Sequence, residues 1–241
     1  QQQGLEKTLP LLRGEFAFAL FDRQEDCLYL VRDRFGVKPQ YWSLTPQGLV
    51  FGSELKVLFA HPAVERRFTS DGLFHQLMQT MVPGSTAFAG VHQVQPGHVV
   101  KIQRSARGLD VSEWKYWDID FPKQEERDHN LDEAHHVAAI RSALLEAVEL
   151  RMVADVPVGC YLSGGIDSCS ILGLASAVSQ NPVKAFTIGF DDNRYDESPI
   201  AQEMAESTGA QQDVMRLSGK ELYGHMAVSY THLTLPTNQC V

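Results

Sequence analysis

Segment 161–168, which reads Tyr-Leu-Ser-Gly-Gly-Ile-Asp-Ser, combines residue types that bind phosphate groups in proteins. Gly164 and Gly165 can adopt backbone angles that are closed to other residues, so several N–H groups could point into one concavity. Ser163 and Ser168 supply hydroxyl donors beside the glycines. The positive end of a following helix would add to the attraction for an anion. The spacing therefore predicts a loop that binds polyphosphate.

Asp167 lies inside the same segment and indicates a bound cation. A carboxylate repels a phosphate unless a cation lies between them, and Mg²⁺ commonly bridges carboxylates and substrate phosphates. The segment lacks the lysine of a Walker loop, and the sequence has no G-x-G-x-x-G dinucleotide pattern. A purely structural alternative stays open, in which the glycines make a tight strand-to-helix turn and Ser or Asp caps the helix.

The surrounding pattern predicts the elements that position this segment. An apolar run at 158–162 indicates a buried strand before the loop, and the spacing of Ile171, Leu172, Ala175 and Val178 indicates a helix after it. Later elements are expected at 183–190 (strand), 198–207 (helix, ended by Gly209) and 214–217 (strand). Strands that alternate with helices through short connections favour a doubly wound parallel sheet, with the loop at the carboxyl end of its strand.

A helix with one buried face is expected just before this region. Its apolar stripe consists of Val137, Ile140, Leu144, Val148 and Met152.

The first half of the chain has the pattern of an antiparallel sheet. The expected elements are hairpin strands at 16–21 and 27–31, 41–44 and 49–52, and 99–103 and 115–119, with helices at 53–59 and 71–80. The charged residues Arg32, Asp33, Arg34 and Lys38 form either a solvated turn or a cluster between the sheet and an interface.

A charged stretch divides these two halves. We expect a first domain at 1–122, a linker at 123–130 and a second domain at 131–227. Residues 228–241 are expected to be a non-native tail, because they resemble the in-frame translation of a common sequencing adapter.

The S-G-G-x-D-S string resembles the pyrophosphate-binding loop of enzymes that split ATP into AMP and pyrophosphate, such as asparagine, β-lactam, GMP and argininosuccinate synthetases. Segments 13–22, 32–39 and 51–56 resemble the class II glutamine amidotransferase domain found in asparagine synthetases. The Tyr-Trp-Asp string at 116–118 and the Asp-Glu-Ser string at 196–198 also resemble that family, and the similarity covers about residues 10–217.

The resemblance implies an Ntn-type glutaminase remnant (α+β) followed by a doubly wound α/β nucleotide-binding domain. It implies an asparagine synthase that uses ATP and Mg²⁺ to convert aspartate to asparagine through β-aspartyl-AMP, with ammonia from glutamine. Leu162 and Ile188 would flank the adenine and ribose, and Ser163, Gly164, Gly165, Asp167 and Ser168 would hold pyrophosphate and Mg²⁺. A homodimer is left open for the full-length enzyme.

The family's N-terminal cysteine nucleophile and its second nucleotide loop, S-G-x-G-x-D-E, are missing from this sequence. We therefore expect a chain truncated at both ends, without a catalytic residue, that neither hydrolyses glutamine nor makes asparagine. Two alternatives stay open: a related amidotransferase or β-lactam-synthetase-like ligase acting on another carboxylate, and a non-catalytic nucleotide-binding fragment.

Composition narrows the class of protein. The formal net charge of −9 and the lack of a basic run make nucleic acid an unexpected partner. No apolar stretch reaches the roughly 20 residues that a membrane span needs, so no membrane partner is expected. The four cysteines have no C-x-x-C spacing, which favours buried thiols in a reducing cytoplasm.

Overall fold

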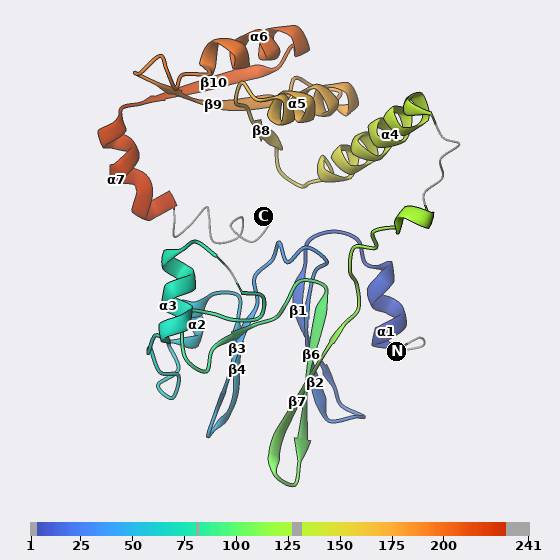
Figure 1. The fold of residues 1–241 in the computed structure, drawn as a ribbon, viewed down its shortest axis with the longest axis vertical. Helices are drawn as coiled ribbons and strands as arrows, with labels where there is room; N and C mark the ends of the chain where they lie inside the picture. Colours follow the sequence, from blue (N-terminus) through green and yellow to red (C-terminus); the bar gives the residue numbers. More distant parts are fainter. Residues whose placement is uncertain (1–3, 81, 127–131, 230–241) are drawn as a thin grey trace. The chain divides into compact units, whose positions relative to one another are not determined.

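The computed structural model describes residues 4–80, 82–126 and 132–229. The chain divides into two compact units, one built from residues up to Phe121 and one spanning Pro122–Ala227 (Figure 1). Each unit has its own sheets and its own hydrophobic core. The functional assignment of the two units to a glutaminase and a synthetase domain stays a prediction at this point.

The first unit contains two antiparallel sheets. A four-stranded sheet has the order β1 (Ala17–Asp22), β2 (Cys27–Arg32), β6 (His98–Ser105) and β7 (Gly108–Lys115). A three-stranded sheet has the order β4 (Gly48–Gly52), β3 (Tyr41–Thr45) and β5 (His92–Gln93). The first two predicted hairpins are therefore confirmed, with β1 pairing β2 and β3 pairing β4.

The third predicted hairpin is wrong in its second strand. We expected the return strand at 115–119, whereas β7 ends at Lys115 and begins at Gly108. Gly108 has a φ of 122°, which a residue with a side chain rarely adopts. This glycine lets the chain reverse directly after Ser105, so β7 pairs with β6 along its whole length.

The short helices of this unit are α1 (Leu5–Thr8), η1 (Leu9–Leu11), α2 (Leu55–Leu58) and α3 (Ser70–Leu77). Helix α3 was expected to continue to Thr80. It ends earlier because Gln79 has a left-handed φ of 54°, and the N–H of Thr80 then bonds back to the carbonyl of His75.

Arg32 and Asp33 are each only 1% exposed, so the expectation of a solvated turn is wrong for this pair. The Asp33 carboxylate accepts hydrogen bonds from the backbone N–H groups of Phe16, Phe35, Val37 and Lys38. The Arg32 guanidinium donates to the carbonyls of Gly36, Lys38 and Val94. The pair therefore organises the loop after β2 through main-chain contacts.

The second unit contains a parallel sheet of three strands, in the order β10 (Gln211–Leu217), β9 (Lys184–Phe190) and β8 (Gly159–Tyr161). Helices α5 (Ile166–Val178) and α6 (Ser198–Thr208) connect these strands. The left-handed Gly209 that was expected after α6 is confirmed, with a φ of 67°.

The described residues do not form the predicted doubly wound sheet. Ala185 of β9 belongs to one hydrophobic cluster with Val148 of α4 (Glu133–Arg151), Leu172 of α5 and Ala201 of α6, so these three helices pack on one face of the sheet. On the other face, Phe186, Ile188 and Met215 are exposed, and no described helix covers them. A doubly wound sheet, as expected from the alternation of strands and helices, would have helices on both faces.

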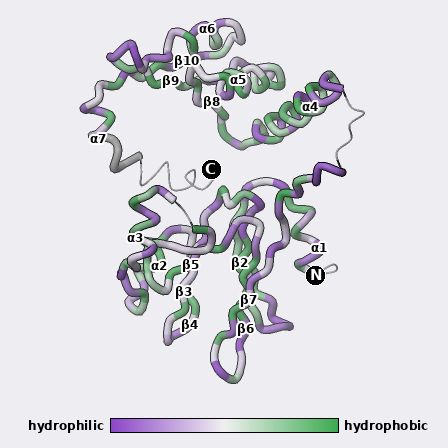
Figure 2. The backbone as a smooth tube through the Cα atoms, in the orientation of Figure 1, coloured by the Kyte–Doolittle hydropathy of each residue, from purple (hydrophilic) through white to green (hydrophobic). Residues whose placement is uncertain are grey.

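Helix α4 forms as expected, but only part of its apolar stripe is buried. Val148 is 7% exposed, whereas Val137 and Ile140 are 57% and 61% exposed. Hydrophobic and hydrophilic positions alternate along this helix (Figure 2). Only its C-terminal half packs against α5, because Val148 and Met152 reach the cluster there.

Helix α7 and the predicted linker lie near the ends of this unit. Helix α7 (Gly219–Ser229) starts with a capping box, in which Ser218 accepts from the N–H of Glu221 and the Glu221 carboxylate accepts from the N–H of Ser218. The predicted linker contains η2 (Gln124–Glu126), and its remaining residues 127–130 lie outside the described residues. Residues 230–241 of the predicted tail also lie outside them.

Candidate functional site

The predicted phosphate loop lies between the carboxyl end of β8 and the first residue of α5, as expected from the sequence. Leu162 is 2% exposed and its N–H donates to the carbonyl of Phe186 at 2.8 Å, which continues the parallel pairing by one residue. Gly165 is the N-cap residue of α5, so the loop leads directly into the N-terminus of a 13-residue helix. This end of a helix attracts anions.

Ser163 and Ser168 are brought together across the loop. Their hydroxyl oxygens lie 2.8 Å apart, and the N–H of Ser163 donates to the Ser168 hydroxyl at 3.1 Å. The N–H of Gly165 donates to the Ser163 hydroxyl at 3.3 Å. Each hydroxyl can rotate its proton toward an incoming acceptor, so the two serines can redirect donors to a bound anion.

The two glycines have a different role from the predicted one. Neither has a positive φ, and Gly165 is in the extended region with a φ of −76° and a ψ of 151°. Close packing favours glycine at position 164 instead. A Cβ atom at position 164 would lie 3.1 Å from the Cβ of Glu197 and 3.2 Å from the Cβ of Ile200. The small residue therefore lets the first turn of α6 approach the loop.

Thr187 forms a hydrogen bond with the residue at the start of the loop, and the sequence analysis gave it no role. It is 3% exposed, and its hydroxyl donates to the carbonyl of Leu162 at 2.9 Å. The side-chain amide of Gln212 donates in turn to the Thr187 hydroxyl at 2.9 Å. A threonine at an inward position of an apolar strand is the signal that could have identified this residue, because a buried hydroxyl needs a partner.

Glu197 is the second residue that sequence reasoning missed. Its carboxylate oxygen Oε2 accepts a hydrogen bond from the N–H of Gly164 at 3.0 Å. The preceding Asp196 accepts from the N–H of Ser198 at 3.1 Å and lies 3.5 Å from the Arg216 guanidinium. Hydrogen bonds from Ser198, with a smaller effect of Arg216, lower the pKa of Asp196. The Asp-Glu-Ser string is thus placed beside the phosphate loop.

Asp167 lies in the first turn of α5 and is exposed. Within the described part of the chain its carboxylate has no hydrogen-bond partner, and no group of three or more His, Cys, Asp or Glu side chains is arranged to hold a metal. A single free carboxylate fits a cation that takes its remaining ligands from substrate phosphates and water, which is how Mg²⁺ is commonly bound.

Leu162 and Ile188 are not brought together as side chains. Leu162 belongs to the cluster under the helices, whereas Ile188 is 50% exposed on the uncovered face of the sheet. Because side chains alternate between the faces of a strand, Leu162 shares its face with Thr187 and not with Ile188. Only the backbone of Leu162 is placed to contact a ligand on the same side as Ile188.

Two family models match the chain in sequence order. The model described as a glutamine amidotransferase domain matches residues 1–117, and the model described as asparagine synthase matches residues 139–239. Together the two models match most of the chain. This result confirms the resemblance drawn from the sequence motifs.

Individual relatives of this chain carry two kinds of name. Asparagine synthetase [glutamine-hydrolyzing] 3 of Bacillus subtilis is 31% identical over 96% of this chain and 39% of its own length. Asparagine synthetase [glutamine-hydrolyzing] 1 of the same organism is 31% identical over 96% of this chain and 35% of its length. Amidase chyE of Penicillium rubens is 33% identical over 93% of this chain and 34% of its length. The chain therefore spans between a third and two fifths of these relatives.

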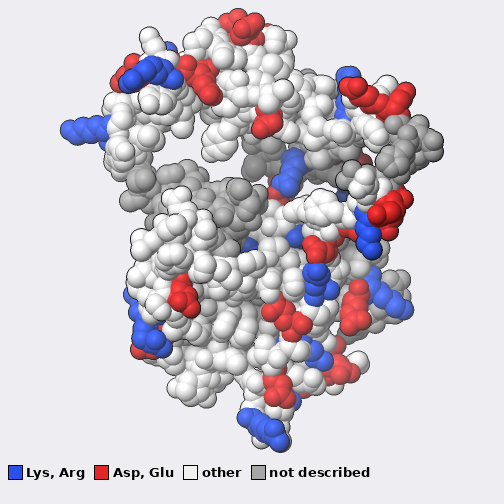
Figure 3. Space-filling view, viewed as in Figure 1, with Lys and Arg blue, Asp and Glu red and all other residues white. Residues whose placement is uncertain are grey.

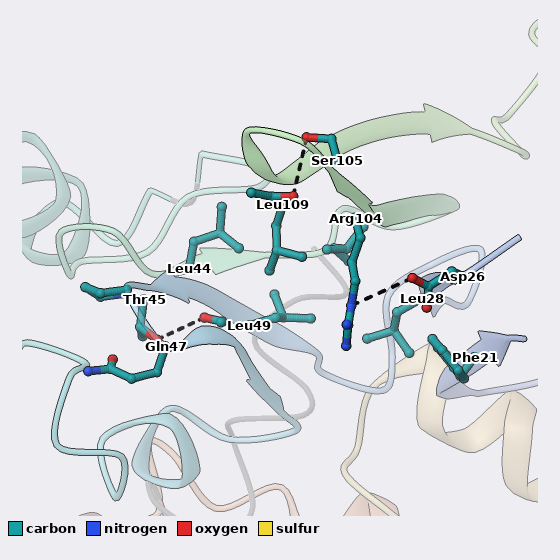
Figure 4. A pocket seen from close by; sticks show the side chains of 14 residues that line it. Phe21, Asp26, Leu28, Leu44, Thr45, Gln47, Leu49, Arg104, Ser105 and Leu109 are labelled. Atoms are coloured by element: carbon teal, nitrogen blue, oxygen red, sulfur yellow. Dashed lines mark hydrogen bonds and ion pairs between the residues drawn. The ribbon is translucent and has the colours of Figure 1, made fainter.

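The phosphate loop does not line either of the two described cavities. A cavity of about 450 Å³ lies between α4, β8 and α5. A larger one of about 800 Å³ lies in the first unit between the hairpin ends of the two sheets (Figure 4). Its charged lining is the Arg104–Asp26 pair, 3.8 Å apart, and it contains no cysteine or histidine. Cys160 lines the smaller cavity, but no histidine or acidic side chain lines it beside this thiol.

On the face drawn in Figure 3, basic side chains are scattered among acidic ones and form no continuous patch. Among the described helices, none combines the length and apolar character that crossing a bilayer would require.

Proposed function

We propose that this chain contributes the ATP-pyrophosphate site of a glutamine-dependent amide-forming ligase that converts aspartate to asparagine. In this proposal the second unit binds ATP through Ser163, Gly164, Gly165 and Ser168, with Asp167 facing a magnesium ion. The first unit is the later part of the domain that releases ammonia from glutamine. The single observation that supports the proposal best is the placement of the S-G-G-x-D-S loop at the carboxyl end of β8 and the N-terminus of α5.

The proposed reaction activates a carboxylate before it is amidated. A side-chain carboxylate oxygen of aspartate attacks the α-phosphorus of ATP, the bond from that phosphorus to the bridging oxygen breaks, and pyrophosphate leaves with the electron pair. Ammonia then attacks the acyl carbon of β-aspartyl-AMP, AMP leaves with the electrons of the acyl–oxygen bond, and one proton is released. The enzyme must therefore stabilise negative charge on the leaving pyrophosphate.

The loop supplies donors suited to that charge. The Ser163 and Ser168 hydroxyls can rotate toward phosphate oxygens, and the free N–H groups at the start of α5 carry the positive end of the helix dipole. Asp167 would hold the magnesium ion, which neutralises charge on the pyrophosphate when it is bound. The buried Thr187 would keep the Leu162 carbonyl, and hence the start of the loop, in a fixed position.

A second candidate function is amidation of a different carboxylate. Amidase chyE and Amidase chry2 of Gibberella zeae are 33% and 32% identical to this chain, values similar to those of the asparagine synthetases. Identity therefore does not separate an aspartate-specific enzyme from a relative with another acceptor. A β-lactam-synthetase-like ligase would use the same adenylation step, and a non-catalytic nucleotide-binding fragment would use the loop for binding alone.

Calorimetric titration of the purified chain with pyrophosphate and with MgATP tests the site. The double variant Ser163→Ala/Ser168→Ala should lose at least about tenfold in affinity, since two hydroxyl donors are removed. Ser170→Ala is a matched control, because the Ser170 hydroxyl donates to the Ile166 carbonyl within the same helix. Equal affinity of the double variant and the unmodified chain would contradict the proposed site.

Carboxylate-dependent exchange of labelled pyrophosphate into ATP distinguishes the candidate functions. A full-length family member that carries this sequence should catalyse the exchange with aspartate if it makes asparagine. Exchange with another carboxylate alone would favour the second candidate. Nucleotide binding without exchange for any carboxylate would favour the binding fragment.

A further inference from the structure

The Glu197 carboxylate accepts a hydrogen bond from the Gly164 N–H, one of the N–H groups that the proposed function assigns to pyrophosphate binding. Its Oε2 atom lies 3.0 Å from the Gly164 nitrogen. The side chain is exposed, so core packing does not force it into this position. Within the described residues Glu197 forms no ion pair with a lysine or arginine. Its negative charge is therefore balanced locally by the loop amide and the nearby helix terminus.

A carboxylate oxygen and a phosphate oxygen are equivalent acceptors for a backbone N–H group. One N–H group makes one good hydrogen bond, so both oxygens cannot use the Gly164 amide at the same time. Two anions in one small site also repel each other. Pyrophosphate that enters the loop must therefore displace the Glu197 side chain or bind without the Gly164 amide.

The backbone around Glu197 is fixed while its side chain is free to move. Asp196 is held by the Ser198 N–H and by Arg216, and Gly164 lies against the first turn of α6. Rotation about the side-chain bonds of Glu197 is enough to release the Gly164 amide, and α6 can stay in place. Because the side chain is exposed, water can solvate the released carboxylate.

We propose that Glu197 is an internal competitor for the phosphate loop, which holds the Gly164 amide when the site is empty and yields it to pyrophosphate. This inference rests on the proposed function of the loop. Its consequence is a lower affinity for pyrophosphate than the loop alone would have. When pyrophosphate leaves the loop, the Glu197 carboxylate would return to the Gly164 N–H, and this return favours the release of pyrophosphate.

The test is calorimetric titration of the full chain with sodium pyrophosphate, in EDTA and again with excess Mg²⁺. In EDTA, Glu197→Gln should bind pyrophosphate more tightly than the unmodified chain. Glu197→Ala should bind about two- to fivefold more tightly, the range expected for removing one exposed charged contact. Glu203→Gln is the matched control, because it removes the same charge from an exposed position of the same helix and should leave the affinity unchanged.

Whether the Glu197 variants bind pyrophosphate more tightly or more weakly distinguishes a competitor from a residue that braces the loop or binds the cation. A Glu197 side chain that braces the loop would make both variants bind pyrophosphate equally or more weakly, which would overturn the inference. Weaker binding seen only with Mg²⁺ would assign Glu197 to the cation and would also overturn it. If no variant binds pyrophosphate, the proposed function fails and the inference fails with it. The backbone ¹⁵N–¹H resonance of Gly164 should shift in ligand-free Glu197→Ala, and an unchanged resonance would refute the contact itself.

Discussion

The hydroxyl of Thr187 on β9 lies 2.9 Å from the carbonyl oxygen of Leu162, the residue that follows β8. This bond joins two neighbouring parallel strands at the point where the phosphate loop begins. Both residues are almost completely buried, so water cannot replace the bond.

Thr187→Val should therefore destabilise the second unit by about 1–3 kcal/mol, because the Leu162 carbonyl and the Gln212 amide each lose a buried partner. Urea unfolding followed by circular dichroism measures the change. Thr187→Ser keeps the hydroxyl and is the control; it should recover most of the loss. A valine variant as stable as the parent chain would show that the bond carries no net stabilisation.

Asp167→Asn should weaken Mg²⁺-dependent ATP use in a full-length family member that carries this sequence, while glutamine hydrolysis stays largely intact. The reason is that the exposed carboxylate has no partner among the described residues and is free to face a cation. Separate assays of glutamate release and pyrophosphate release measure the two half-reactions. Asp191→Asn, another exposed aspartate of the same unit, is the control. An equal loss of both half-reactions would mean that Asp167 has a structural role.

Tyr116 should make the stability of the first unit depend on pH in alkaline solution. Burial, with a smaller effect of Asp33, raises the pKa of Tyr116 to about 12, from an ordinary value of 10.0. Between these two values the unfolded chain has lost the tyrosine proton and the folded chain has kept it. Raising the pH through this window therefore favours unfolding, and the contribution is fully present below pH 10.

Urea unfolding of the parent chain and of Tyr116→Phe across this pH range measures the effect. The variant loses the bond from the Tyr116 hydroxyl to the Arg32 carbonyl, so it should be less stable by about 1 kcal/mol at pH 8. The difference should shrink as the pH rises above 10. Tyr29, whose pKa is also raised to about 12 by its hydrogen bond with Cys27 and by burial, leaves part of the dependence in the variant. A difference that does not change with pH would contradict the prediction.

Asp33→Asn should destabilise the first unit by about 2–3 kcal/mol. The buried carboxylate accepts from four backbone N–H groups, and a neutral amide loses charge assistance and turns one acceptor atom into a donor. Thermal or urea unfolding measures the loss. Asp110→Asn makes the same chemical change at an exposed position of β7 and should alter stability by less than about 0.5 kcal/mol.

The sequence was sufficient to predict features that depend on local pattern. The strand, loop and helix around Ser163 and the glycine that ends α6 both follow from residue types at fixed spacing. The strand that begins at Gly108 was missed because residues 99–103 were paired with the more distant apolar run at 115–119. The nearby turn before Gly108 was not recognised. Turn chemistry decided the pairing there.

Tertiary contacts could not be predicted in the same way. Thr187 and Glu197 reach the loop only because β9 pairs with β8 and α6 folds back over Gly164, and no local pattern encodes these approaches. The exposed face around Phe186 and Ile188 was also unexpected, since an apolar strand predicts burial without saying which element provides it. The contacts of these residues depend on the placement of whole elements.

The tight approach of α6 to Gly164 has a consequence for how this family can diverge. A Cβ atom at position 164 would lie 3.1 Å from the Cβ of Glu197 and 3.2 Å from the Cβ of Ile200, so α6 would have to move slightly, whatever the loop binds. A descendant that lost nucleotide binding would therefore still keep this glycine, because replacing it would require α6 to shift. Ser163 and Asp167, which are exposed, would drift freely in such a descendant. The serine and the aspartate, and not the glycine, are the positions that should distinguish active lineages from inactive ones.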